Sequence, residues 1–202
     1  DAPALVQIVS YNVLSSSLAT PSHFRHCDPA DLDAHTRLAR LLSKLEEQVA
    51  TRAIICLQEV SLAWSGPLHS FFASHQFHFV FANYGSFFSG YFGVGLAFPI
   101  NAFEALDIKI ERLTDSHRWP QKPKPTGVVK FVADLRTRVI GVWSALFNDL
   151  DAPKNFKRGA SAANTRPSDV WHQSRDRRNM LIFARLRSKA NGARLCVGTY
   201  HM

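Results

Sequence analysis

The amino-acid sequence predicts an α/β fold, because two strand-like segments flank a helical one near the start of the chain. Residues 5–13 are rich in β-branched and aromatic side chains, which favour strands. Residues 31–49 repeat apolar side chains at helical spacing, and residues 53–60 form an apolar run that contains Glu59 near its end. Strand, helix and strand in this order predict neighbouring strands that bring Asn12 and Glu59 to the same edge of a sheet.

Five more strands are predicted further along the chain. Residues 76–81 and 93–98 flank a loop rich in glycine and aromatic residues, and residues 105–112 alternate apolar and charged side chains. Residues 180–187 and 194–201 lie on either side of an Asn-Gly turn, which is typical of a β-hairpin.

The segment between these strands gives a weaker pattern. Residues 117–127 contain three prolines and predict an extended connection. Residues 128–150 fit either a helix or strands. Residues 151–174 have the composition of a loop, and we expect residues 143–174 to form an insertion into a single domain that spans residues 1–202.

The composition indicates a folded domain with no membrane span. Hydrophobic residues make up 46% of the 202 residues and charged residues 20%, as in globular proteins. No apolar run reaches the roughly 18 to 20 residues that a membrane-spanning helix needs. The three cysteines (Cys27, Cys56 and Cys196) lie far apart, which predicts free thiols in a reducing intracellular compartment, with Cys56 and Cys196 buried.

The whole chain has a net charge of +8, and its positive charge is concentrated in the second half. Residues 1–101 contain 5 Lys and Arg against 7 Asp and Glu, whereas residues 102–202 contain 19 against 9. This asymmetry predicts a basic face for a polyanion, most simply nucleic acid. A generally basic surface, for example in a protein docked on a larger RNA-rich assembly, is the alternative.

Glu59 and Asn12 are the first candidates for chemistry. A carboxylate at the edge of a sheet can hold a hard cation such as Mg²⁺ through oxygen ligands. An asparagine at a neighbouring strand end can donate its amide to a phosphate oxygen or orient another ligand. Taken by itself, a glutamate after a buried strand is more often a solvated loop carboxylate than a metal ligand.

Short motifs strengthen the first interpretation. Residues 10–14 (Ser-Tyr-Asn-Val-Leu) and 57–60 (Leu-Gln-Glu-Val) resemble the first two motifs of the endonuclease/exonuclease/phosphatase superfamily. The segment between them, residues 24–42, is similar to the deadenylase branch of that superfamily. Residues 90–98 resemble a later family strand, and residues 197–201 resemble the strand whose terminal histidine contacts the scissile phosphate.

This resemblance implies a sandwich of two packed mixed sheets flanked by helices, of which the chain is the N-terminal portion and supplies roughly the first sheet. It also implies that Glu59 binds Mg²⁺, or alternatively Mn²⁺. Asn12 would orient the carboxylate or the phosphate, and His201 would bind a phosphate oxygen or act as an acid. We further expect Arg177 and Arg178 to contact nucleic-acid phosphates, although a solvated basic loop fits them as well.

The function that the resemblance implies is metal-dependent hydrolysis of phosphodiesters, with 3′-end trimming of RNA in the deadenylase manner as the specific expectation. Enzymes of the same fold that cleave lipid or DNA phosphodiesters are one alternative. A non-catalytic structural or RNA-binding domain of a larger complex is another. The family's later motifs, Asp-x-Asn and Ser-Asp-His, belong after His201, so residues 1–202 alone are expected to be inactive.

Overall fold

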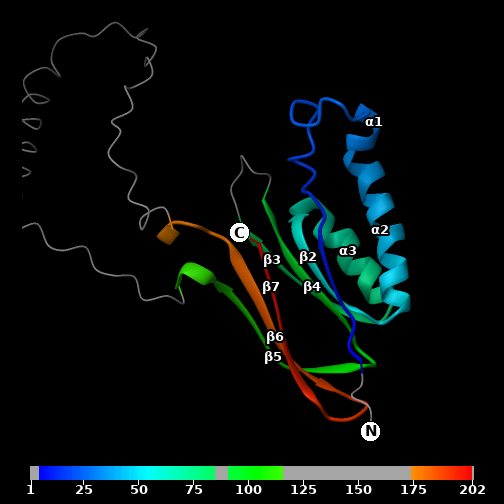
Figure 1. Ribbon diagram of the computed structural model, residues 1–202, viewed down its shortest axis with the longest axis vertical. Coiled ribbons are helices and arrows are strands. Elements are labelled where there is room, and N and C mark those ends of the chain that lie inside the picture. The colour runs from blue at the N-terminus through cyan, green and yellow to red at the C-terminus, as the bar shows by residue number, and fades with distance from the viewer. Residues whose placement is uncertain (1–4, 85–90, 116–173, 202) are drawn as a thin grey trace, which may run out of the picture. The chain divides into compact units, whose positions relative to one another are not determined.

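A four-stranded mixed sheet forms the centre of the fold (Figure 1). The computed structural model describes residues 5–84, 91–115 and 174–201. The strands are β1 (Ile8–Asn12), β2 (Ile54–Ser61), β3 (Phe77–Tyr84) and β4 (Phe92–Pro99), in the order β1-β2-β4-β3. β1 and β2 are parallel, whereas β4 runs antiparallel to both of its neighbours. The predicted neighbouring strands, which end at the same edge of the sheet, are therefore confirmed.

The connection between β1 and β2 contains two helices rather than the single predicted helix. Helix α1 (Pro29–Leu32) and helix α2 (Ala34–Ala50) are separated by Asp33, whose backbone is extended. The Asp33 carboxylate accepts a hydrogen bond from the backbone N–H of Thr36 at 2.8 Å and so caps α2. Helical periodicity continues across Asp33, which is why the sequence pattern did not reveal the break.

Helix α3 (Leu62–Ser74) had no counterpart among the predicted elements. It contains Gly66 and Pro67, which are unfavourable inside a helix. Tertiary packing compensates, because Trp64, Leu68 and Phe72 are buried on the face of the helix that contacts the sheet.

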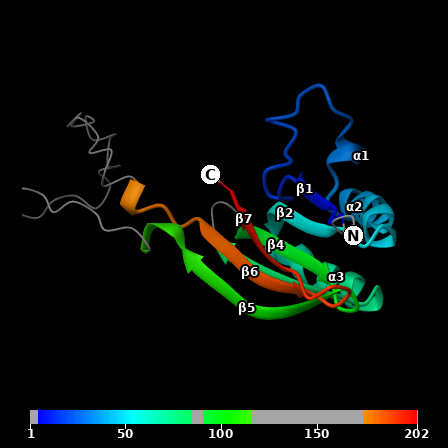
Figure 2. The ribbon, with the colours of Figure 1, turned by 60° about the horizontal axis from the view of Figure 1, so that its bottom comes forward.

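A second sheet is formed by β5 (Phe103–Arg112), β6 (Met180–Ser188) and β7 (Arg194–Tyr200), in that order (Figure 2). All of its described pairings are antiparallel, and the predicted hairpin between β6 and β7 is confirmed, with Gly192 at a φ of 72°. A single 3-10 turn, η2 (Leu113–Asp115), follows β5. The expectation that the chain supplies roughly the first of two mixed sheets is wrong, because its strands belong to two sheets. The described strand pairings of the second sheet are antiparallel.

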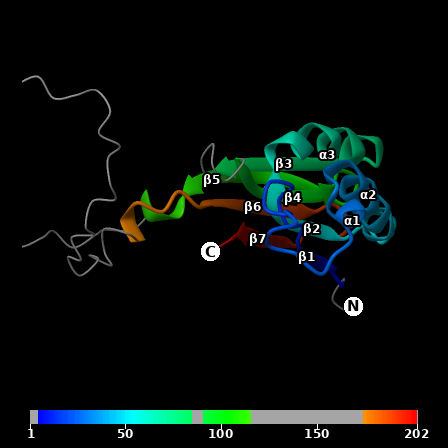
Figure 3. The same ribbon diagram turned by 90° about the horizontal axis from the view of Figure 1, so that it is seen from above.

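Three layers result, with α2 and α3 on one face of the first sheet and the second sheet on the other (Figure 3). β2 lies in the middle and alternates between the two interfaces. Ile55 and Leu57 pack with the helices, whereas Ile54 and Cys56 pack against the second sheet. A strand that is buried on both faces explains the continuous apolar run in the sequence.

Cysteine burial differs from the expectation at one position. Cys27, Cys56 and Cys196 are all free thiols, and Cys56 is buried as predicted. Cys196 is exposed, because it lies on the outer face of the edge strand β7, whereas its neighbour Val197 is buried on the other face. No helix within the described ranges is long and apolar enough to cross a membrane. The predictions for residues 117–173, including nearly all of the expected insertion at 143–174, lie outside the described residues.

Gly93 allows β3 and β4 to approach closely, and this generates a stability prediction. A Cβ atom at position 93 would overlap the carbonyl oxygen of Ala82 on β3. We expect Gly93→Ala to lower the free energy of unfolding by about 1 to 3 kcal/mol, the usual effect of overpacking. Gly198→Ala on β7 is the matched control, since its added Cβ has only ordinary contacts at 3.7 Å or more. Equal urea midpoints for the two variants would contradict the steric explanation.

Candidate active site

A β-bulge places Glu59 at the site. The pairing of β2 with β4 shifts between Gln58 and Val60, so Glu59 is the extra residue, with a left-handed φ of 57°. Regular alternation would turn Glu59 to the same side as Leu57, into the core beneath the helices. The bulge instead returns Val60 to that core and leaves Glu59 facing Asn12 and His201. Such a backbone conformation is unfavourable by about 1 to 3 kcal/mol and is typical of functional sites.

Asn12 ends β1, directly beside the bulge. Its register partner in the parallel pair is Gln58, the residue before Glu59. The side-chain carbonyl of Asn12 accepts the backbone N–H of Leu14 at 2.9 Å. Its Nδ2 donates to Glu59 Oε1 at 2.7 Å. Both ends of the amide are thus engaged, and the orientation of Asn12 is fixed.

His201 reaches the same carboxylate from the second sheet. Its Nε2 lies 3.3 Å from Glu59 Oε1, and its Nδ1 lies 3.0 Å from the hydroxyl of Tyr84. In the neutral ring, the Tyr84 hydroxyl donates to Nδ1 when Nε2 carries its proton towards Glu59. Asn179 donates from Nδ2 to the backbone carbonyl of His201 at 2.7 Å and holds the strand end in place.

Burial favours the protonated form of Tyr84. The side chain is 8% exposed, and burial raises the pKa of its hydroxyl, with smaller contributions in the same direction from Glu59 and Tyr200. Tyr84 therefore stays a hydrogen-bond donor throughout the neutral range.

Gln58 joins the two sheets beneath these residues. Its Nε2 donates to Thr199 Oγ1 on β7 and to Ser10 Oγ on β1, at 3.2 Å in each case. Thr199 is 2% exposed, so its hydroxyl needs partners within the protein, and Gln58 is one of them. One side chain thus sets the distance between three strands at the site.

The free oxygen of Glu59 fits a cation. Glu59 Oε2 is buried without a hydrogen-bond partner among the described residues, and the side chain is 12% exposed. A buried carboxylate oxygen needs a partner, and Mg²⁺ is commonly held by one or two carboxylates with water and phosphate completing its shell. Among the described residues no group of three or more His, Cys, Asp and Glu could enclose a metal. The donor set therefore fits Mg²⁺ bound through a single protein carboxylate.

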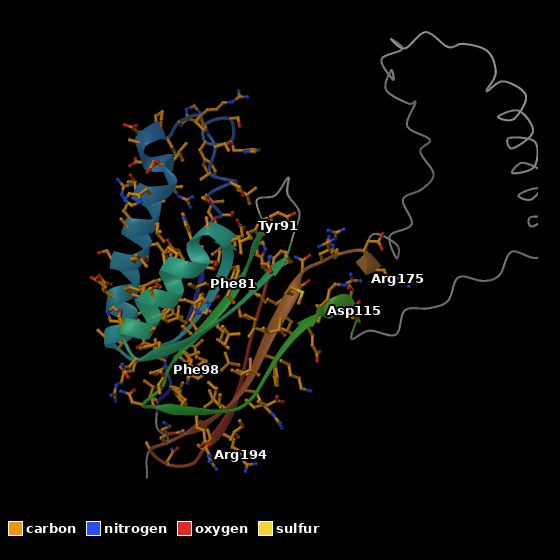
Figure 4. The ribbon with its side chains drawn as sticks, turned by 180° about the vertical axis from the view of Figure 1, so that it is seen from behind. Phe81, Tyr91, Phe98, Asp115, Arg175 and Arg194 are labelled. Atoms are coloured by element: carbon orange, nitrogen blue, oxygen red, sulfur yellow. The ribbon has the colours of Figure 1, made fainter. Side chains whose placement is uncertain are left out.

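The structure does not bring every predicted site residue together. Asn12 and His201 each contact the carboxylate of Glu59. Arg177 and Arg178 are exposed just before β6, and neither guanidinium bonds to another described residue. Figure 4 shows Arg175, their neighbour in sequence, at the same end of the second sheet as Asp115, whereas Arg194 lies at the opposite end.

Sequence analysis missed Tyr84, Asn179 and Gln58 as parts of the site. Tyr84 is the last residue of an aromatic strand, where core packing is the simplest interpretation of the pattern. Asn179 and Gln58 contact residues that are distant in sequence, and no local spacing pattern indicates such contacts. The predicted strand ended at residue 81 and left Tyr84 in the following loop, whereas β3 continues to Tyr84 in the structure, so the sequence pattern gave no strand-end signal for it.

The Tyr84–His201 contact gives a pH prediction. Because the folded pKa of Tyr84 is raised, its contribution to stability is complete below the ordinary tyrosine pKa and is lost as pH rises above it. We expect Tyr84→Phe to lower the free energy of unfolding by about 1 kcal/mol at neutral pH. The difference from wild type should shrink above about pH 10, where unfolded tyrosine ionises. Urea unfolding at neutral and alkaline pH measures both effects, and a difference that stays constant would contradict the assignment.

Known structures share this arrangement of strands. No protein-family model and no curated protein sequence matches the chain. In structure it is similar to ANGEL2, described as a 2′,3′-cyclic phosphatase, with a TM-score of 0.59, 19% identity and 96% of this chain covered. ANGEL2 in complex with adenosine-2′,3′-vanadate gives a TM-score of 0.58 at 18% identity. The human Nocturnin catalytic domain with bound sulfate gives 0.55 at 15% identity over 100% of this chain.

The matches are partial on the side of the known structures. The chain spans 40% of the ANGEL2 chain and 51% of the Nocturnin chain. At these identities the comparison establishes architecture, and it agrees with the two-sheet sandwich that the sequence motifs predicted. The chain therefore has the two-sheet α/β sandwich fold of ANGEL2 and Nocturnin.

Proposed function

We propose that the protein is a magnesium-dependent phosphodiesterase that acts on the 3′ end of RNA. The observation that carries this proposal is the cluster of Asn12, Glu59 and His201, in which Glu59 Oε2 is buried without a partner. A purely structural carboxylate would have both oxygens paired at this depth. An orphaned oxygen beside a histidine and an amide donor supports a site that receives a cation and a phosphate.

Each residue of the cluster has a role that follows from its contacts. Asn12 occupies Glu59 Oε1 and thereby leaves Oε2 as the oxygen that would hold Mg²⁺. The ion, when bound, would polarise a phosphoryl oxygen and neutralise charge that develops on it. His201 would offer Nε2–H to a phosphate oxygen, while Tyr84 keeps Nδ1 in the acceptor form. The bulged backbone at Glu59 holds these groups in position before substrate arrives.

Two features support RNA as the substrate class. The second half of the chain has 19 Lys and Arg against 9 Asp and Glu, a net charge of +10, as expected for a polyanion ligand. ANGEL2 and Nocturnin share the fold, and the ANGEL2 complex holds an adenosine-2′,3′-vanadate. That ligand makes the opening of a 2′,3′-cyclic phosphate at an RNA end a second candidate reaction. Trimming of a polyadenylated 3′ end remains the first candidate, because residues 24–42 resemble the deadenylase branch.

Activity assays on Glu59 test the proposal. Because the chain spans about half of the matched structures or less, the assay uses the full-length protein that contains these residues. Substrates are a polyadenylated RNA with a free 3′ hydroxyl, the same RNA ending in a 2′,3′-cyclic phosphate, a DNA of equal length and sphingomyelin vesicles, each with and without Mg²⁺. Glu59→Gln keeps the shape of the side chain, and we expect it to reduce kcat/KM on RNA by roughly 10³-fold, the loss of several kcal/mol of charge stabilisation.

Glu46→Gln on the exposed surface of α2 is the matched control and should retain full activity. Shortening of the polyadenylated RNA supports the first candidate reaction, whereas conversion of the cyclic end alone supports the second. Cleavage of DNA or lipid in preference to RNA would overturn the substrate class. Tight, salt-sensitive RNA binding without hydrolysis of any substrate would instead indicate a binding domain.

The exposed arginines before β6 lead to a separate prediction. Arg177 and Arg178 immediately precede Asn179, whose side chain binds the backbone of His201. They are therefore adjacent in sequence to a residue that contacts the cluster. If they contact phosphates, Arg177→Gln/Arg178→Gln should weaken RNA binding and reduce the slope of log K against log salt concentration by roughly 0.7 per lost contact. Arg194→Gln, at the opposite end of the second sheet, should leave the slope unchanged (Figure 4). An unchanged slope in the double variant would favour a solvated loop.

A further inference from the structure

Arg37 on α2 reaches into the turn that follows β1. Its Nη2 donates to the backbone carbonyls of Val13 and Leu14, at 2.8 and 2.5 Å. Two carbonyl oxygens that converge on one point repel each other, and a guanidinium donor relieves that repulsion. Leu14 adopts a left-handed φ of 53°, which is unfavourable for a leucine. Arg37 therefore stabilises a backbone conformation that the chain would otherwise avoid.

The guanidinium is itself held in place. Its Cζ lies 5.2 Å from the centroid of the Trp64 ring on α3, a cation–π contact. Its Nη1 is buried without a hydrogen-bond partner. Burial lowers the pKa of Arg37, while the charges of Tyr11 and Glu59 favour its protonated form. A partly buried guanidinium that leaves one buried nitrogen unpaired is unfavourable, and its presence here points to a role beyond packing.

The turn connects Arg37 to the cluster. The N–H of Leu14 donates to the side-chain carbonyl of Asn12, and the amide of Asn12 donates to Glu59 Oε1. The N–H of Val13 is bound to the carbonyl of Gln58, next to the bulge. Rotation of the Leu14 peptide would therefore release one end of the Asn12 amide. The described hydrogen bonds of the Arg37 side chain go to the turn and not to Asn12 or Glu59, so its hold on the Asn12 amide passes through the turn, beside a direct charge interaction with Glu59.

We infer that Arg37 is a positioning residue, which fixes the turn at residues 13–14 and thereby holds the Asn12 amide on Glu59. The kinetic consequence rests on the proposed function, whereas the structural consequence does not. Loss of Arg37 should loosen the Asn12–Glu59 hydrogen bond in the free protein. It should also lower kcat more than it changes KM, because Asn12 orients a group of the reacting site rather than binding distant parts of the substrate.

The structural consequence is measured by NMR on the full-length protein with asparagine labelled with ¹⁵N. Asn12→Ser identifies the side-chain signals of Asn12. In Arg37→Met we expect the Asn12 side-chain amide to exchange with water roughly tenfold faster, as for a locally opened hydrogen bond. Arg37→Lys should lie between Arg37→Met and wild type, because an ammonium group can bind a carbonyl but lacks the planar stack on Trp64.

Two controls separate positioning from general stability. Arg40→Met removes an exposed arginine of the same helix, which pairs with Asp31. Leu38→Ala removes a partly buried side chain of α2 that packs on the core, and so lowers stability without touching the turn. Both should leave Asn12 exchange at the wild-type rate.

Wild-type exchange in Arg37→Met would overturn the inference, as would equally fast exchange in Leu38→Ala. If Arg37→Met does not fold, Arg37→Lys decides, and faster Asn12 exchange than in Arg40→Met is the supporting result. In an active protein, kcat should fall roughly tenfold in Arg37→Met with KM changed less than about twofold, and recover in part in Arg37→Lys. A protein without activity on any substrate would count against the proposed function alone, and Asn12 exchange would still decide the role of Arg37.

Discussion

The bulge at Glu59 is the constraint on which the rest of the structure depends. Without it the carboxylate would lie in the core under α2 and α3, where an unpaired charge costs several kcal/mol. The left-handed backbone costs about 1 to 3 kcal/mol, so the bulge is the less unfavourable arrangement. It also restores Val60 to the core, which lets β2 stay buried on both faces on either side of the interruption.

The site lies where the interface between the two sheets changes from apolar to polar contacts. Most of that interface is apolar, with residues such as Leu96, Phe98 and Ile182 fully buried. Near the strand ends it becomes polar, through Gln58 to Thr199 and Tyr84 to His201. Apolar contacts set the spacing of the sheets without fixing their direction, whereas hydrogen bonds require particular angles. The polar end therefore sets the register of one sheet against the other.

Much of the fold was predictable because local patterns determine it. The apolar run of β2 and the Asn-Gly turn each reflect a single segment of chain, and both predictions were confirmed. Helix α3 was not predictable, because packing on the sheet overrides the unfavourable Gly66 and Pro67. The contact between Asn12 and Glu59 was predictable from the order of the elements. The bulge at Glu59 and the contact of His201 with Tyr84 were not predictable in this way. Both depend on contacts between distant segments, and a single sequence carries no direct record of these.

The hydrogen bond between Gln58 and Thr199 joins residues 141 positions apart, whereas Asn12 and Glu59 are separated by 47. The chain entropy lost on closing a loop grows with its length, and contacts of long separation slow folding. The pairing of β1 with β2 can therefore form early, before β7 docks. We therefore expect His201 to join the cluster after Asn12 and Glu59 have met, because its contact requires β7 to dock.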